Sequence, residues 1–464
     1  MKGGAIMSSK HSPTALQILD NIIEQTVSHI QDFTKSPNDF TRNRKLNAVT
    51  TIKVTLNMQG NSLNTELIDA FPNLDDRMTA SAYEQQKAKL TPEVFKHIFD
   101  EYNTTISNPS TMQGYRVFAI DGSDFNPPYQ SKSAFVMNMS NGRPRKDGEP
   151  VKPFSQIHAN MLYDLENHIY QDCVLQPKSQ SNEREAAIDM LKNLDVGKFI
   201  VLMDRGYDGF NMIENCNRIE NCNYVIRTKA GHGGIKEIAN LPDRECDVEM
   251  DFKVTTSNRY YILNKDEEIL HLISSPKNHY KKYFSPNTRN QRWDFGQFCH
   301  VKCRVVKFRI NNPDTGKEEW EVLLTNLNRF EFPLCKMKTL YHKRWDIETS
   351  FRELKYALGG VQFHSRKDDF VLMELYAHFI MFNAVSRNIM CVKVPKQNDN
   401  KHTYTISFKE ACTITRKYYR LHNNEPPDHI YVEILAYTIP IREGRSDKRN
   451  MKPKSAIWFM YRVA

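Results

Sequence analysis

The sequence predicts an α/β protein whose sheet-forming core is split by a β-rich insertion and preceded by a helical region. Three observations support this fold class. Helical periodicity dominates residues 14–110, apolar strand-like runs alternate with helices over 115–229, and helical periodicity is lost over 231–333. At 464 residues the chain exceeds one ordinary domain, so we expect several structural units.

The composition favours a polyanionic partner without requiring one. Lys and Arg number 64 against 55 Asp and Glu, which gives a net charge of +9. The N-terminus carries no secretory signal pattern, and no apolar run reaches the ~18 residues of a membrane span. We therefore expect a cytoplasmic protein that does not contact the membrane.

The helical region is expected over residues 1–110. An amphipathic segment at 15–24 is followed by a basic patch at 42–45. Two further helical segments, 61–71 and 78–90, are compatible either with a DNA-reading helix-turn-helix or with an ordinary helical bundle.

The first part of the core is expected over residues 111–230. The pattern predicts strands at 115–120, 133–139, 156–163, 168–176, 198–203 and 223–229, and helices at 183–194 and 210–219. Short strands that alternate with helices are typical of an α/β sheet.

The β-rich insertion is expected over residues 231–333. Its predicted strands are 249–255, 259–263, 301–310 and 320–325. The core then resumes over 334–395 with a helix at 341–357 and a strongly apolar helix at 370–382. Residues 396–464 are expected to form a C-terminal helical region with a basic tail, which contacts DNA or supports multimerisation.

Two aspartates stand in the same sequence context. Asp121 and Asp204 each end an apolar strand and are followed by a glycine within two residues. Polar groups at the carboxyl ends of strands commonly build the sites of α/β sheets. An isolated strand-end aspartate is more often a turn residue, and Asp124 and Asp208 are the nearest rival acids.

A third carboxylate lies on a helical stripe with phosphate-binding residue types. At about 100° per residue, Tyr341, Arg344, Glu348 and Lys355 fall within roughly 60° of one another, with Arg352 beside them. Arg344 can also pair with Glu348 within the helix, four residues apart. Asp121, Asp204 and Glu348 together offer hard oxygen ligands suited to magnesium or manganese. Two such ions can activate the attacking oxygen and stabilise the leaving oxygen in phosphodiester chemistry.

These motifs resemble those of a known family. The unbroken spacing Tyr341-x2-Arg344-x3-Glu348-x6-Lys355 resembles the Tyr-Arg-Glu-Lys signature of DDE transposases of the insertion-sequence-four family. Phe118-Ala-Ile-Asp121-Gly-Ser and Val201-Leu-Met-Asp204-Arg-Gly-Tyr207 resemble its two aspartate blocks. The resemblance runs from about Gly114 to Phe382 and implies a ribonuclease H-like catalytic core with a β-rich insertion.

The same resemblance implies an activity and a set of partners. It implies that Asp121, Asp204 and Glu348 bind magnesium, as two ions that manganese can replace. It further implies a nucleoid-associated enzyme that binds the terminal inverted repeats of its element and works as a homodimer in a synaptic complex. The enzyme would cleave each double-stranded end and join it to target DNA. Tyr341, Arg344 and Lys355 would contact DNA near the transferred strand.

The insertion carries a candidate for base recognition. Family members that excise by cut-and-paste use a tryptophan there to hold a flipped base. Trp320 lies in the comparable predicted strand, one residue out of register, and Trp293 is a second candidate. The ordinary alternative for Trp320 is a buried or edge-strand aromatic.

Two other functions share parts of this pattern. A ribonuclease H-like nuclease would use the same acids to hydrolyse DNA without joining it. A catalytically inactive domesticated or inhibitory derivative would only bind DNA. Retention of Asp121, Asp204 and Glu348 with Arg344 and Lys355 favours catalysis, because a pure binder has no use for carboxylates beside phosphates.

Overall fold

The computed structural model describes most of the chain. The described residues are 13–42, 44–137, 153–231, 234–264, 269–273, 293–311, 316–360, 362–395, 403–421 and 425–441. The predicted basic tail, which begins at Arg442, lies outside these residues, as does the end of the strand predicted over 133–139.

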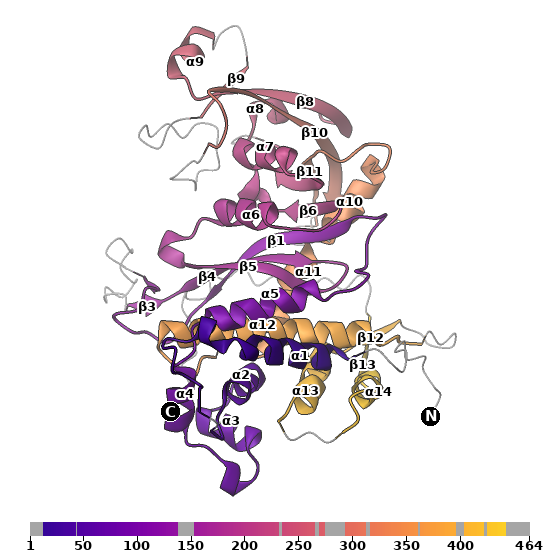
Figure 1. Cartoon of the computed structure of the whole chain (residues 1–464). Helices are drawn as coiled ribbons and strands as arrows, with labels where there is room; N and C mark the ends of the chain where they lie inside the picture. The colour runs from indigo at the N-terminus through magenta and orange to yellow at the C-terminus, as the bar shows by residue number, and fades with distance from the viewer. Residues whose placement is uncertain are drawn as a thin grey trace, which may run out of the picture.

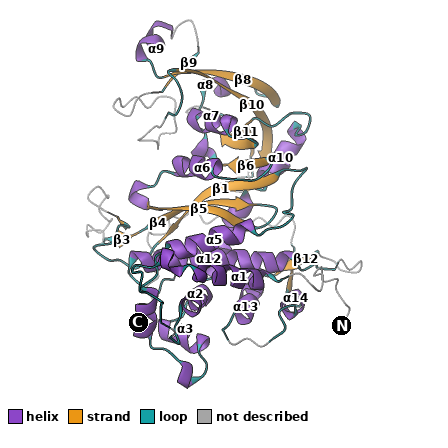
Figure 2. Cartoon of the chain, viewed as in Figure 1, coloured by secondary structure: helices purple, strands orange, loops and turns teal. Residues whose placement is uncertain are grey.

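A nine-stranded mixed sheet runs through the molecule, and the protein has the predicted α/β fold (Figures 1 and 2). The order of its strands is β5-β4-β1-β6-β7-β11-β10-β8-β9. Their bounds are β1 Arg116–Phe125, β4 Ile157–Asp164, β5 Ile169–Pro177, β6 Phe199–Met203, β7 Cys222–Thr228, β8 Cys246–Thr255, β9 Leu270–Leu272, β10 Phe298–Asn311 and β11 Glu318–Thr325.

The first five of these strands form a ribonuclease H-like arrangement. β1 is parallel to β6, and β6 is parallel to β7. β4 is antiparallel to both of its neighbours, β1 and β5. The apolar runs predicted at 156–163, 168–176, 198–203 and 223–229 lie in these strands, because alternating or continuous apolar residues pack on helices at both sheet faces.

The insertion strands extend this sheet. β11 is antiparallel to β7, β10 is antiparallel to β11 and β8 is antiparallel to β10. One predicted strand in this region is wrong: residues 259–263 belong to the short helix α9 Asn258–Asn264. No residue of α9 is buried, so the apolar run there does not reflect a sheet face packed on the core.

Helices cover both faces of the sheet. α6 Glu183–Lys192 and α7 Phe210–Arg218 pack on one face, over a core that includes Phe118, Val201 and Leu324. The other face is covered by α5 Glu93–Thr104, α10 Leu334–His342, α11 Trp345–Arg352 and α12 Asp368–Met390. Short two-stranded sheets pair β2 Val136–Met137 with β3 Phe154–Ser155, and β12 Tyr404–Ile406 with β13 Thr438–Pro440.

α12 is the central helix of the lower half of the molecule (Figure 1). Most of its side chains are buried, and it contacts β5, α5 and α13 Phe408–Tyr418. It also contacts the N-terminal helices α1 Ala15–Ser28 and α2 Ala48–Asn57. The outer helices are α3 Leu63–Ala70, α4 Ala80–Lys87 and α14 His429–Leu435. Among the described residues, no helix combines the length and apolar character needed to span a bilayer.

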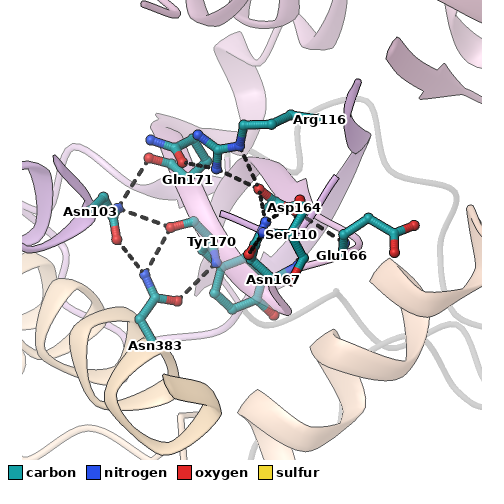
Figure 3. Close-up of polar contacts among 9 residues, drawn as sticks. All are labelled: Asn103, Ser110, Arg116, Asp164, Glu166, Asn167, Tyr170, Gln171 and Asn383. Carbon is teal, nitrogen blue, oxygen red and sulfur yellow. Dashed lines mark hydrogen bonds and ion pairs between the residues drawn. The ribbon is translucent and has the colours of Figure 1, made fainter. Parts of the chain in front are cut away.

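Two asparagines cover the outer edge of the sheet. β5 is an edge strand, and such strands carry unpaired backbone groups. Asn383 of α12 accepts a hydrogen bond from the Tyr170 N–H at 2.8 Å and donates to the Tyr170 carbonyl at 2.9 Å. Asn103 of α5 donates to the carbonyls of Tyr170 and Gln171 (Figure 3). These side chains therefore join α5 and α12 to the sheet through its backbone.

The same region ties the start of β1 to the β4–β5 turn. The guanidinium of Arg116 donates to Asp164 and to the Gln171 side chain, and Asp164 also accepts from Asn167 (Figure 3). Asp164 is completely buried, and a buried charge needs such partners; these donors compensate it. This network fixes the N-terminal end of β1, and Asp121 lies further along the same strand.

Candidate active site

The two aspartates lie just beyond the paired part of adjacent parallel strands. The β1–β6 ladder runs from Arg116 with Phe199 to Ala119 with Leu202. Asp121 and Asp204 each follow two residues later, at the same edge of the sheet. Asp204 directly follows the end of β6, as predicted, whereas β1 continues to Phe125 and Asp121 lies within it, so the predicted strand end at Asp121 is wrong.

Arg344 brings the third acid to this edge. Its guanidinium lies 3.7 Å from Asp121 Oδ2 and donates a 2.9 Å hydrogen bond to Glu348 Oε1. The Arg344 side chain is only 6% exposed, whereas the two carboxylates are 25% and 32% exposed. The i,i+4 pair considered for Arg344 thus exists, and the same guanidinium also bridges to β1.

Burial and nearby negative charges raise the pKa of the Asp121 carboxyl. Desolvation, together with the negative charges of Asp204 and Glu348, raises the pKa of Asp121 to about 6. The Gly122 N–H, which donates to Asp121 Oδ1 at 2.8 Å, and the charge of Arg344 oppose this rise. The three acids are therefore electrostatically coupled, and a cation among them would relieve their repulsion.

The carboxylates are held by protein partners in this structure. Asp204 Oδ1 accepts the Gly206 N–H at 2.7 Å, while Glu348 is paired with Arg344. Across the described ranges, no three acidic, histidine or cysteine side chains are arranged as ligands of one ion. The donor set fits a hard cation chemically, because it supplies carboxylate oxygens around a positively compensated edge. These side chains would have to turn from their present partners to share an ion.

The helix that carries the signature residues is interrupted, which corrects the prediction of one continuous helix. Tyr341 lies in α10, Arg344 precedes α11, and Lys355 lies in a π-helical turn, Glu353–Ala357. Leu354, within this turn, and Leu358, directly after it, are both buried in the core. Arg344 still contacts Glu348 and lies near the Tyr341 ring, whereas Lys355 contacts the Asp124 segment instead.

The signature side chains lie in different environments. Tyr341 is 3% exposed and its hydroxyl donates to the carbonyl of Met203 at 3.4 Å, directly before Asp204. Lys355 Nζ donates to the carbonyl of Asp124 at 2.7 Å and lies over the Phe125 ring. Tyr341 and Lys355 therefore brace the two aspartate segments, and Arg352 is exposed on the helix surface.

Trp320 is placed away from the three acids. Its strand neighbours of the same parity, Val322 and Leu324, belong to the core under α6 and α7, on the face opposite to α11. The indole N–H donates to Asp243 at 2.6 Å, and Lys307 and Arg309 lie over the ring. The second candidate, Trp293, donates to the carbonyl of Gly296 and packs against the same core.

The sequence did not reveal a polar group behind the acids. His158 of β4 lies between Asp124 and Glu183, at 2.6 and 3.0 Å from their oxygens, and Lys178 lies 3.0 Å from Asp124. Only the rival acid Asp124 was singled out from sequence. His158 sits in a strand that reads as uniformly buried, and its role depends on residues distant in the chain.

A sheet of this order, with one acid in β1, a second directly after β6 and a third on a helix that covers one face of the sheet, is typical of nucleic-acid-processing enzymes with a ribonuclease H-like core. A family model described as a transposase DDE domain matches residues 112–384. The chain belongs to this family, because the match covers more than half of its length.

Other comparisons add less. A search of curated proteins finds no match. Among solved structures, the chain is similar to that of a piggyBac transposase synaptic complex with hairpin DNA, determined by cryo-EM. The two are 11% identical with a TM-score of 0.49, and the alignment covers 96% of this chain and 90% of the other.

Proposed function

We propose that this protein is a transposase of the insertion-sequence-four type that acts on the ends of its own element. It binds the terminal inverted repeats, cleaves the DNA ends and transfers them to target DNA by magnesium-dependent phosphoryl transfer. Membership of the transposase DDE domain family supports the general activity. The observation that carries the site is the contact of one buried guanidinium, Arg344, with both Asp121 and Glu348.

Asp121, Asp204 and Glu348 would hold the magnesium ions, two in number and replaceable by manganese. When bound, such ions supply an activated oxygen nucleophile and stabilise the leaving oxygen. The chain's own residues prepare the site: Tyr341 braces the strand before Asp204, and Arg344 pairs with Glu348 and faces Asp121. The Arg344 guanidinium, at the edge of the metal site, would also bind a DNA phosphate.

The DNA would run along the edge of the sheet where these acids lie. Arg344 and Lys355 are the proposed phosphate contacts, with Tyr341, Arg352 and Trp320 as further DNA-contacting residues. Arg352 is exposed and can reach a ligand directly. Trp320 could stack on a base only after its contacts with Lys307 and Arg309 change.

The remaining regions would supply end recognition and pairing. Residues 1–110 would bind the inverted repeat, and residues 396–464 would contact DNA or support multimerisation. Two ends must be held together for strand transfer, so a homodimer in a synaptic complex is proposed as the working unit, close to the nucleoid.

The test is magnesium-dependent cleavage of the element's terminal DNA by wild type and by Glu348→Gln. We expect the variant to lose cleavage by at least about 100-fold while it binds the end with nearly unchanged affinity. Glu353→Gln, a change of the same type one turn away, is the matched control and should cleave normally. Cleaved ends joined to target DNA would separate a transposase from a plain nuclease.

Two outcomes would contradict the proposal. Normal cleavage by Glu348→Gln would remove Glu348 from the metal site. End binding without cleavage by the wild type would favour the alternative of an inactive DNA-binding derivative.

A further inference from the structure

The first turn of α6 lies behind the two aspartate segments, on the face of the sheet opposite to Arg344. α6 begins at Glu183, and the side chain of the preceding residue, Asn182, accepts the Glu185 N–H and fixes the helix start. Consecutive residues Glu183 and Arg184 reach two different segments from this turn: Glu183 contacts His158 of β4, beside β1, and Arg184 contacts the loop after Asp204. The proposed function does not account for either of them.

Arg184 holds the segment that follows Asp204. Its Nε donates to the carbonyl of Gly206 at 2.7 Å, and its Nη2 lies 3.7 Å from Asp208 Oδ1. A Cβ added at Gly209 would lie 3.0 Å from Arg184 Nη1, so the guanidinium also packs against the backbone there. The Arg184 side chain is 17% exposed. It thus contacts this loop at Gly206, Asp208 and Gly209, shortly after the proposed metal ligand.

Glu183 holds the segment around Asp121 through a histidine. Glu183 Oε1 lies 3.0 Å from His158 Nε2, and His158 Nδ1 lies 2.6 Å from Asp124 Oδ1. A Cβ at Gly122 would come within 2.5 Å of the imidazole ring, so only glycine fits between the ring and the residue that follows Asp121. The imidazole therefore packs against Gly122 of β1, and Glu183 of α6 contacts its Nε2.

Side chains have to fix the distance between the two aspartates, because the backbone does not. The β1–β6 hydrogen-bond ladder ends at Ala119 and Leu202, two residues before each acid. Beyond that point β1 pairs only with β4, and β6 pairs only with β7. Contacts from outside the ladder decide how far apart the acids stand, and the first turn of α6 is attached to both segments.

We propose that this turn is a clamp that sets the separation of Asp121 and Asp204, with Glu183 and Arg184 as positioning residues. The inference rests on the proposed function, in which these aspartates bind metal. Partners that orient metal ligands commonly change metal affinity by about 10- to 100-fold when removed. Loss of the clamp should therefore weaken metal binding before any DNA is present.

The experiment measures binding of Mn²⁺ alone to the full-length protein, from the free-ion electron paramagnetic resonance signal. Arg184→Ala should raise the dissociation constant by roughly tenfold. Arg218→Ala removes an arginine of α7 that forms a surface pair with Glu214, and it should bind Mn²⁺ like wild type. Arg184→Lys keeps the charge opposite Asp208 but loses the planar fork, so it should bind with intermediate affinity.

Controls separate this inference from the proposed function. Asp204→Asn should abolish tight Mn²⁺ binding, and if it does not, the metal site itself is misassigned. If Asp204→Asn loses binding while Arg184→Ala and Arg184→Lys bind like wild type, only the clamp is overturned. If thermal unfolding shows that Arg184→Ala does not fold, Arg184→Lys and Glu183→Gln decide. Unchanged Mn²⁺ affinity in both of these would overturn the clamp.

Discussion

At the residue scale, Arg344 compensates part of the negative charge of the carboxylates at this edge of the sheet. Its guanidinium is nearly inaccessible and lies against acids from β1 and α11. The planar guanidinium of an arginine is always protonated and can face two carboxylates at once. It therefore suits this position better than the single ammonium group of a lysine. The buried Arg344 Nε has no hydrogen-bond partner among the described residues, so the group retains one spare donor.

The raised pKa of Asp121 makes metal binding depend on pH. Since this carboxyl is protonated below about pH 6 in the free protein, a metal must displace its proton there. Mn²⁺ affinity should be level above pH 7 and should fall by about tenfold per pH unit below 6. A titration series from pH 5 to 8 measures this. Burial raises the pKa of Glu353 to about 7, so Glu353→Gln is the control and should leave the midpoint unchanged.

Lys355 provides a test of the DNA path. Removal of one phosphate contact should weaken end binding and reduce the slope of log affinity against log salt by about one unit. The measurement is fluorescence anisotropy with Lys355→Ala over a range of salt concentrations. Lys192→Ala, at the far end of α6, is the matched control. An unchanged slope for Lys355→Ala would place this residue off the DNA.

At the scale of elements, the sequence predicted the strands of the core more reliably than the helix of the signature. β1, β6 and β7 carry apolar runs, and these runs identify the segments as strands from the local sequence alone. The break between α10 and α11 and the π-helical turn at Glu353–Ala357 depend on packing against distant residues. Local periodicity contains no information about such contacts, and for the same reason it misassigned α9 as a strand.

Only part of the candidate site could be predicted, because some roles depend on contacts between distant parts of the chain. Asp121 and Asp204 stand out because each follows an apolar run, and Glu348 stands out because it shares a helical stripe with phosphate-binding residue types. His158 and Arg184 carry no such mark, since their roles arise only when β4 and α6 pack beside β1 and β6. The residues that would bind a ligand were visible in the sequence, whereas those that position them were not.

The joint between α4 and α12 gives a prediction about stability. Lys87 and Glu374 form a 2.8 Å pair with 1% exposure on each side, and the His364 N–H also donates to Glu374. Glu374→Gln should lower the free energy of unfolding by about 3–5 kcal/mol, because it leaves a buried lysine uncompensated. Urea denaturation measures this loss. Asp369→Asn on the same helix breaks the exposed pair with Lys35 and should cost less than about 1 kcal/mol.

This pair also predicts how stability depends on pH. The charge of Lys87 and the hydrogen bonds from His364 and Lys87 outweigh desolvation and hold the pKa of Glu374 well below its usual range. Its contribution is therefore complete above about pH 4.5 and is lost as the pH falls further. The difference in stability between wild type and Glu374→Gln should shrink below pH 4.

At the scale of the whole molecule, the described strands of the insertion continue the core sheet. Sequence patterns showed that residues 231–333 are β-rich, but the pairing of β11 with β7 required the structure. Strand pairing depends on side-chain contacts between strands that are far apart in the sequence. The periodicity of one segment contains no information about its partner strand.

The N-terminal helices also depend on the rest of the chain. Leu19, Ile23, Phe95 and Phe99 belong to the same core as α12, and Phe99 lies against Tyr376 and Phe379. A fragment of residues 13–110 should therefore lack a stable fold and give low helicity by circular dichroism. A cooperative thermal transition of this fragment would contradict the expectation.

The central position of α12 also affects how the protein is synthesised. α1 ends at Ser28 and α12 begins at Asp368, so about 340 residues are translated between the helix and its packing partner. At ~5–20 residues per second the ribosome needs roughly 20–70 s for this interval. Until then α1 can pack only on α2 and α5, and the apolar surface that α12 later covers stays open to other partners on the nascent chain.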